Sequence, residues 1–288
     1  MKPNIYSAYR TINSSLTLCL SISSILLSQN ASAAILNASL GGTFNMNLDR
    51  NAFAILAEGT VENPGHFLVH YYDTAESDYT QFTDSYFYLG NTSRTEIPAI
   101  NLVHDITPVS TSNPGGQAQN RYVKSTTPNF SVNSDTLAGT GTLGMTGMEL
   151  FRGSYNGSLL LGDLSLRYGI AVRQGVWEEL EQEGTPSGWY LQNNVSFSAV
   201  AYDLENLTVE FSDANNWKMS GDLLMSPENA DFMHGARLAD MGDFCLGVGS
   251  YAGCGVITAV PVPSALWLFV SSLGSLGLAR RFGNRSAS

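Results

Sequence analysis

Positive charge is scarce in this sequence. Only 14 of the 288 residues are Lys or Arg, against 25 Asp or Glu, and five of the basic residues lie near the two ends: Lys2, Arg10, Arg280, Arg281 and Arg285. Residues 34–259 therefore carry a net charge of −16 (9 − 25). This charge repels phosphate backbones, so we expect no nucleic-acid partner. Divalent cations or cationic groups on a polysaccharide suit it, although an acidic surface that keeps a protein soluble is the simpler interpretation.

A long helical pattern is also lacking. Charged residues make up 14% of the chain, while aromatic residues reach 10% and glycine, serine, threonine and asparagine are abundant. Small polar residues among aromatic and β-branched ones favour short strands joined by turns. Because 43% of the residues are hydrophobic, the chain can fill a core. We predict an all-β, β-sandwich-like ectodomain over residues 34–258.

Individual strands are predicted where apolar runs or alternation occur. The clearest stretches are Phe67–Tyr72, Leu164–Tyr168, Val195–Ala201 and Leu207–Phe211. The polar stretch Asp203–Asn206 separates the last two and predicts a hairpin turn. The best helix candidate, Trp177–Glu183, is short and ends at Gly184.

The N-terminus has the three parts of a secretory signal peptide. Lys2 and Arg10 supply positive charge, residues 12–27 are rich in Leu, Ile and Ser, and small residues follow at Ala31 and Ala33. We predict a signal peptide over residues 1–33 that is cleaved after Ala33. A lipoprotein signal at Cys19 is the alternative, but the bulky Leu18 stands where a small residue is expected.

The C-terminus combines a proline motif, an apolar segment and basic residues. The apolar run is short for a membrane span, because about 17 residues are the lower limit for crossing hydrocarbon, but it is sufficient with its flanks. A transmembrane helix is therefore predicted over about residues 264–279. Trp267 near one end suits the membrane interface, and the arginines at the other end favour the cytoplasm. A plain stop-transfer anchor is the simplest interpretation. The motif residues are Val260, Pro261, Val262 and Pro263, and the basic ones are Arg280 and Arg281.

This order of parts over residues 259–283 resembles the PEP-CTERM sorting domain, with Val262 where that motif has Glu. The resemblance implies processing by an exosortase in a Gram-negative host that makes exopolysaccharide. It also implies transient anchoring in the inner membrane, followed by display at the cell surface or release into the matrix. A sortase motif is absent from the sequence, and a GPI signal would lack the basic cluster.

Metal-ligating patterns are weak in this sequence. His66 and His70 are four residues apart, but on the predicted strand they lie ~13 Å apart, and no zincin glutamate follows His66. The acidic loop residues Asp73, Glu76, Asp78 and Asp84 fail the EF-hand pattern, because Asp78 stands where glycine is required. Two interpretations of this loop remain: it binds calcium in another geometry, or it is a solvated loop. We predict no other cofactor.

Two further patterns in the sequence are found in enzymes and ligand sites. Gly139, Gly141 and Gly144 match a dinucleotide motif by letters only, because a strand, not a helix, is expected to follow. Carboxylates near Trp177 offer the pair that a glycosidase needs: Glu178, Glu179, Glu181 and Glu183. The side chains that would stack on sugar rings, if exposed, are Trp177, Trp189 and Trp217, although most tryptophans in a sandwich belong to the core.

Cys245 and Cys254 are the only cysteines that remain after the predicted signal cleavage. They flank a glycine-rich loop in an oxidising compartment, which predicts a disulfide. We expect this bridge to contribute stability, not catalysis.

Together these patterns predict an exported, non-enzymatic, structural or adhesive protein associated with exopolysaccharide or biofilm. The expected partners are an exosortase-type enzyme, the membrane through the C-terminal helix, and exopolysaccharide. A secreted carbohydrate-active hydrolase and a calcium-dependent adhesin are the alternatives. The association with exopolysaccharide follows from the PEP-CTERM resemblance and not from a site in the sequence.

Overall fold

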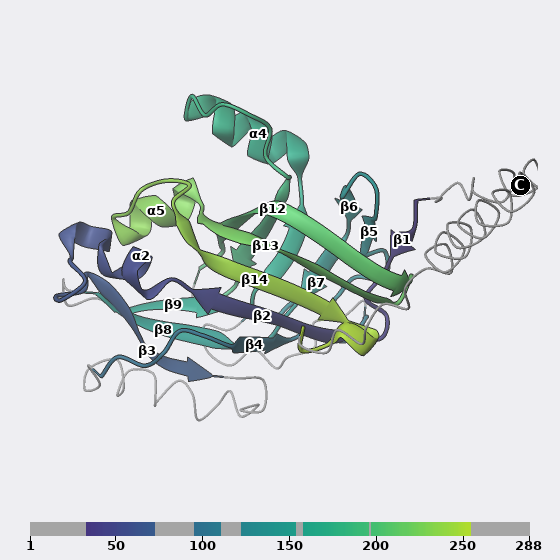
Figure 1. Ribbon diagram of the computed structural model, residues 1–288, viewed down its shortest axis with the longest axis horizontal. Coiled ribbons are helices and arrows are strands. Elements are labelled where there is room, and N and C mark those ends of the chain that lie inside the picture. The colour runs from purple at the N-terminus through teal and green to yellow at the C-terminus, as the bar shows by residue number, and fades with distance from the viewer. Residues whose placement is uncertain (1–32, 73–94, 111–121, 154–157, 196, 255–288) are drawn as a thin grey trace, which may run out of the picture. The chain divides into compact units, whose positions relative to one another are not determined.

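The computed structural model describes residues 33–72, 95–110, 122–153, 158–195 and 197–254. These residues are mostly in antiparallel strands, which confirms the all-β class (Figure 1). The largest sheet has eight strands, in the order β4 (Leu102–Asp105), β2 (Gly42–Leu48), β14 (Asp240–Val248), β13 (Asn216–Met225), β12 (Ala199–Asp213), β11 (Trp189–Asn193), β10 (Ser165–Tyr168) and β7 (Thr142–Gly144).

Two three-stranded sheets accompany it. One is β1 (Ile35–Leu36), β5 (Ser131–Asn133) and β6 (Gly139–Thr140), and the other is β3 (His66–Tyr72), β8 (Met148–Gly153) and β9 (Ser158–Gly162). The helices are α2 (Arg50–Ala54), α4 (Ile170–Glu179) and α5 (Pro227–Met233), with 3-10 turns η3 (Leu56–Glu58) and η4 (Gly249–Tyr251). In Figure 1, α2 and α5 lie at one end of the large sheet, while α4 stands out beyond the β12 side.

Two tryptophans anchor the small β1-β5-β6 sheet to the large one. Trp189 and Trp217 are both 0% exposed. The indole Nε1 of Trp189 donates to the carbonyl of Leu137 at 2.6 Å, and that of Trp217 donates to the carbonyl of Asn37 at 2.7 Å. Each indole thus satisfies a backbone carbonyl next to the small sheet and fills the core with its ring.

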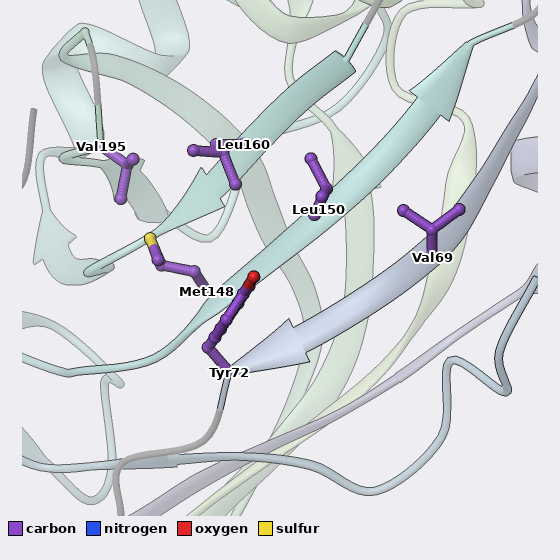
Figure 2. Close-up of a cluster of buried hydrophobic side chains, with 6 residues drawn as sticks. All are labelled: Val69, Tyr72, Met148, Leu150, Leu160 and Val195. Atoms are coloured by element: carbon purple, nitrogen blue, oxygen red, sulfur yellow. The ribbon is translucent and has the colours of Figure 1, made fainter. Parts of the chain in front are cut away.

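The β3-β8-β9 sheet packs apolar side chains on both of its faces. On one face Phe151 stacks on Phe53 of α2, with ring centroids 4.8 Å apart. The other face carries a buried cluster that Val195 joins from the segment after β11 (Figure 2). Its members are Val69, Tyr72, Met148, Leu150, Leu160 and Val195. A sheet that is buried on both faces needs such near-continuous apolar strands, as in the run Leu159–Leu161.

The predicted hairpin turn at Asp203–Asn206 is wrong. Strand β12 runs without a break from Ala199 to Asp213, and its pairing with β13 shifts register between Glu205 and Thr208. Asn206 sits in this irregularity with a φ of 53°. Asparagine tolerates the left-handed region, so the polar stretch marks a bulge inside one strand instead of a turn between two.

Two other predicted strands are confirmed, and the bounds of a third strand and of the helix differ from the prediction. Phe67–Tyr72 lies in β3, and the alternation at Leu164–Tyr168 corresponds to β10, so both strands are confirmed. Strand β11 ends at Asn193 and β12 begins at Ala199, so the strand expected from Val195 begins only at Ala199. The predicted helix starts earlier, at Ile170, and ends at Glu179. Within the described residues no helix is long and apolar enough to cross a membrane, and residues 264–279 lie outside them.

Candidate functional site

A pocket of about 350 Å³ lies where strand β11 parts from strand β12. Its wall comes from the β5–β6 turn, the end of β10, the loop before β11 and the bulge of β12. The polar and aromatic residues of this wall are Thr136, Tyr168, Thr185, Ser187, Glu205 and Asn206. We call it the β12 pocket.

Strand pairing explains why the pocket opens here. Strand β11 pairs with β12 only from Trp189–Leu204 to Asn193–Ala199. Beyond Leu204, β12 continues beside β13, and its bulge sets the direction of Glu205 and Asn206. Gly188 enters this region with a φ of 87°, and a Cβ there would come within 2.9 Å of Tyr168 and of the Ile170 backbone. Only glycine allows that close approach.

Glu205 is the charged group of the pocket. Its Oε1 accepts a hydrogen bond from the Ser187 N–H at 2.9 Å. Partial burial raises the pKa of Glu205 to about 7, the negative charges of Asp203 and Asp222 act in the same direction, and the Ser187 hydrogen bond opposes them. Asp222 is the direct cross-strand partner of Glu205, and like charges in such positions repel each other.

A buried ion-pair network lies next to the pocket. Arg173 of α4 is 1% exposed, and its Nε lies 2.6 Å from Oδ1 of Asp203. Its Nη1 donates to Oε1 of Glu228 on α5 at 2.8 Å, and its guanidinium lies 5.7 Å from the Tyr190 ring centroid. Burial raises the pKa of Asp203, although the Arg173 contact opposes that shift. The network fixes both helices to β12 and commits the charge of Arg173 to two carboxylates.

Tyr168 gives the pocket an aromatic wall. Its ring packs against Trp189 with centroids 5.3 Å apart, so the side chain rests on the core. Among the described residues that line the pocket, Tyr168 is the aromatic one and Glu205 the ionisable acid, and none is Lys, Arg or His. An aromatic ring combined with hydroxyl, amide and carboxylate groups is the chemistry that recognises sugars, whose rings have apolar faces and hydroxyl edges.

The predicted sugar-stacking residues are not in this pocket. The prediction that Trp189 and Trp217 stack on sugar rings is wrong, because both rings are fully buried in the core. Trp177 is half-buried on α4 and does not line the pocket. The carboxylates near it lie on the exposed end of α4 and just after it, and none of them lines the pocket either: Glu178, Glu179, Glu181 and Glu183.

The metal and nucleotide patterns are placed as follows. His66 and His70 both lie on β3; His66 Nε2 is 3.1 Å from the Met233 carbonyl, and burial lowers its pKa. In the part of the chain that the structure describes, no group of three or more His, Cys, Asp or Glu could hold a metal. Gly139, Gly141 and Gly144 lie in and between β6 and β7, so the motif leads into strands and not a helix.

Other predicted sites fall outside the described residues. These are the acidic loop Asp73–Asp84, the signal peptide except Ala33, and the sorting motif Val260–Pro263 with Arg280 and Arg281. The predicted disulfide is confirmed, because Cys245 of β14 is bonded to Cys254 with Cα atoms 6.1 Å apart.

Sequence reasoning missed Glu205 and Tyr168 as site residues. The signal was present in the polar stretch Asp203–Asn206, which was interpreted as a turn. In an otherwise alternating strand, an Asn also fits a bulge, because it tolerates the left-handed region, and bulges are over-represented next to active sites. Comparisons with protein-family models, curated proteins and solved structures found no match to this chain.

Proposed function

We propose that this chain is an exported, non-enzymatic surface protein that associates with extracellular polysaccharide through the β12 pocket. The observation that carries the proposal is the joint presence of Tyr168, Glu205 and several hydroxyl groups around one pocket of about 350 Å³. That volume is in the range of sites that hold small ligands, and it suits one or two sugar units.

The sequence patterns at the two ends support export. A signal peptide over residues 1–33 and a PEP-CTERM-like tail would send the chain to an exosortase and then to the cell surface or matrix. The disulfide Cys245–Cys254 fits this route, because such bonds persist in oxidising compartments. In this proposal the large sheet and its two small partners form a β-sandwich-like ectodomain.

Binding to the host's own exopolysaccharide tests the proposed function. The processed protein should be retained by the immobilised polysaccharide, and Tyr168→Ala should weaken retention about fivefold or more, because a stacked aromatic ring contributes about 1 kcal/mol. Tyr168→Phe keeps the ring and should bind like the wild type. Tyr122→Ala is a matched control, because Tyr122 is 41% exposed and does not line the pocket. Equal retention of the Tyr168→Ala variant and the wild type would contradict the proposal.

The export route has its own test, the intact mass of the protein from its native host in membrane and medium fractions. A species that begins at Ala34 and ends near Val260–Pro263 would support sorting and processing. A membrane species that retains Ser288 would mean a plain C-terminal anchor instead.

A hydrolase is the second candidate function, with Glu205 and Asp222 in place of the carboxylates near Trp177. Glu205, with a pKa of about 7, lies directly across from Asp222, and a carboxylic acid of this pKa beside a second carboxylate suits glycoside hydrolysis. Asp222 does not line the pocket, which favours binding over catalysis. Release of reducing ends from the polysaccharide by the wild type, and its loss in Glu205→Gln, would establish the hydrolase.

A further inference from the structure

We propose that the β12 pocket selects sugars that carry a protonated amine, with the Glu205 carboxylate as the counter-ion. This inference rests on the proposed polysaccharide binding and names the chemical class of the bound sugar. The cation would be an ammonium group on an amino sugar that is not acetylated.

The charge of the pocket favours a cationic ligand. Glu205 lines it, while no basic residue does so among the described lining residues. The neighbouring charges come from four elements. Asp203 on β12 and Glu228 on α5 both contact Arg173 of α4. Asp222 on β13 accepts a hydrogen bond from the Asn206 amide, and Tyr168 on β10 is the remaining titratable side chain of the wall. The Arg173 guanidinium is therefore already paired with two carboxylates.

The geometry of Glu205 also favours an ammonium group. The Ser187 N–H holds Oε1, and the interactions of the described residues include no hydrogen bond to Oε2. A half-buried carboxylate without a cationic partner is costly in free energy. An ammonium group at Oε2 would form a charge-assisted hydrogen bond and offset that cost.

A metal ion fits the pocket less well than an ammonium group. Calcium takes six to eight oxygen ligands, typically from several carboxylates, whereas Glu205 is the one carboxylate on the described wall. The aromatic ring of Tyr168 and the hydroxyl groups of Thr136 and Thr185 offer contacts to the apolar face and the hydroxyl groups of a sugar.

The binding should depend on pH in two directions. The pKa of Glu205 is about 7, so binding should weaken below that pH as the carboxylate becomes protonated. On the alkaline side, binding should weaken again as the ammonium group of the sugar loses its proton. For the amino sugar, the affinity should be highest near neutral pH and fall on both sides. For the same oligomer after N-acetylation, the affinity should not fall as the pH is lowered.

Calorimetric titration with two matched probes tests the inference. The probes are a glucosamine oligomer and an N-acetylglucosamine oligomer of equal length, each added to the processed protein. The wild type should bind the glucosamine oligomer about tenfold or more tightly, since a hydrogen bond between charged groups contributes on that scale. Glu205→Gln should reduce this affinity to that of the acetylated probe. Glu210→Gln is the matched control, because Glu210 lies on the same strand, is half exposed and does not line the pocket.

The outcomes separate this inference from the proposed function. Equal affinity of the wild type for both probes would overturn the amine selectivity and leave polysaccharide binding in place, and this comparison needs no variant. Binding of the native exopolysaccharide with no measurable binding of the glucosamine probe would also overturn the selectivity. Failure to bind either probe or the native polysaccharide would overturn both proposals. An equal loss of affinity for the glucosamine oligomer in Glu205→Gln and Glu210→Gln would assign the preference to the acidic surface. That result would overturn the proposal that the β12 pocket selects the amine.

Discussion

The Nε2 of His104 lies 2.7 Å from Oε1 of Glu149, and both side chains are almost completely buried. His104 belongs to β4 of the large sheet and Glu149 to β8 of a small sheet, so the pair joins the two sheets. The other ring nitrogen, Nδ1, lies 2.9 Å from the Thr146 carbonyl and fixes the orientation of the imidazole. Burial alone would lower the pKa of His104, but Glu149 and the Thr146 carbonyl raise it overall.

Glu149→Gln should destabilise the protein by about 3 kcal/mol, because removing one member of a buried ion pair leaves the other uncompensated. Urea unfolding at pH 6 measures this loss. The double variant with His104→Gln should cost less than the sum of the two single variants, since the groups contact each other. Additive effects would show that the two side chains do not stabilise each other.

The same pair makes stability depend on pH. Because the folded-state pKa of His104 is raised above 6.5, its contribution is fully present below that value and is lost as the pH rises through the raised pKa. This part of the pH dependence should be absent from Glu149→Gln.

Glu205→Gln should stabilise the protein at pH 8 but not at pH 4. The pKa of Glu205 rises from 4.5 to about 7 on folding, so its contribution to stability is fully present below 4.5 and is lost as the pH rises through about 7. With solvent screening discounted at this half-exposed site, the gain at pH 8 is on the order of 1 kcal/mol. Urea unfolding at both values measures it, with Glu210→Gln as the control. The same difference at both pH values would show that the Glu205 charge is not the cause.

Replacing Cys245 and Cys254 by alanine should lower the free energy of unfolding by about 2 to 3 kcal/mol. The two cysteines are nine residues apart, and a disulfide that closes so short a loop removes about that much chain entropy from the unfolded state. Thermal unfolding with and without a reducing agent measures the effect. The wild type should show it on reduction, and the double variant should show no further change.

The disulfide could be predicted from the sequence because its partners are close in the chain. Strands with strong apolar runs or alternation, such as Phe67–Tyr72, could be predicted for the same reason: the pattern of burial is local. The pairing of the cysteines could be predicted from the residue types and the expected oxidising compartment.

The site depended on contacts between distant residues. Asp203 reads as a turn residue, yet it is buried because Arg173, 30 positions away, pairs with it. The indole N–H of buried Trp217 bonds to a carbonyl 180 residues away. Composition shows that such residues can be buried, but not which partner satisfies them.

Asp203→Asn should lower the pKa of Glu205 from its value of about 7. Burial is the largest cause of the raised pKa and stays in place, but the negative charge of Asp203 contributes to it as well. The substitution removes that charge, which favours the Glu205 carboxylate. NMR titration of the Glu205 side-chain carboxyl measures the shift, and Glu210→Gln should leave the midpoint unchanged. If the pocket binds amino sugars through Glu205, the acidic limb of their binding profile should move to lower pH by the same amount. A midpoint that stays at about 7 in Asp203→Asn would mean that burial alone sets the pKa and that the ion-pair network does not tune the pocket.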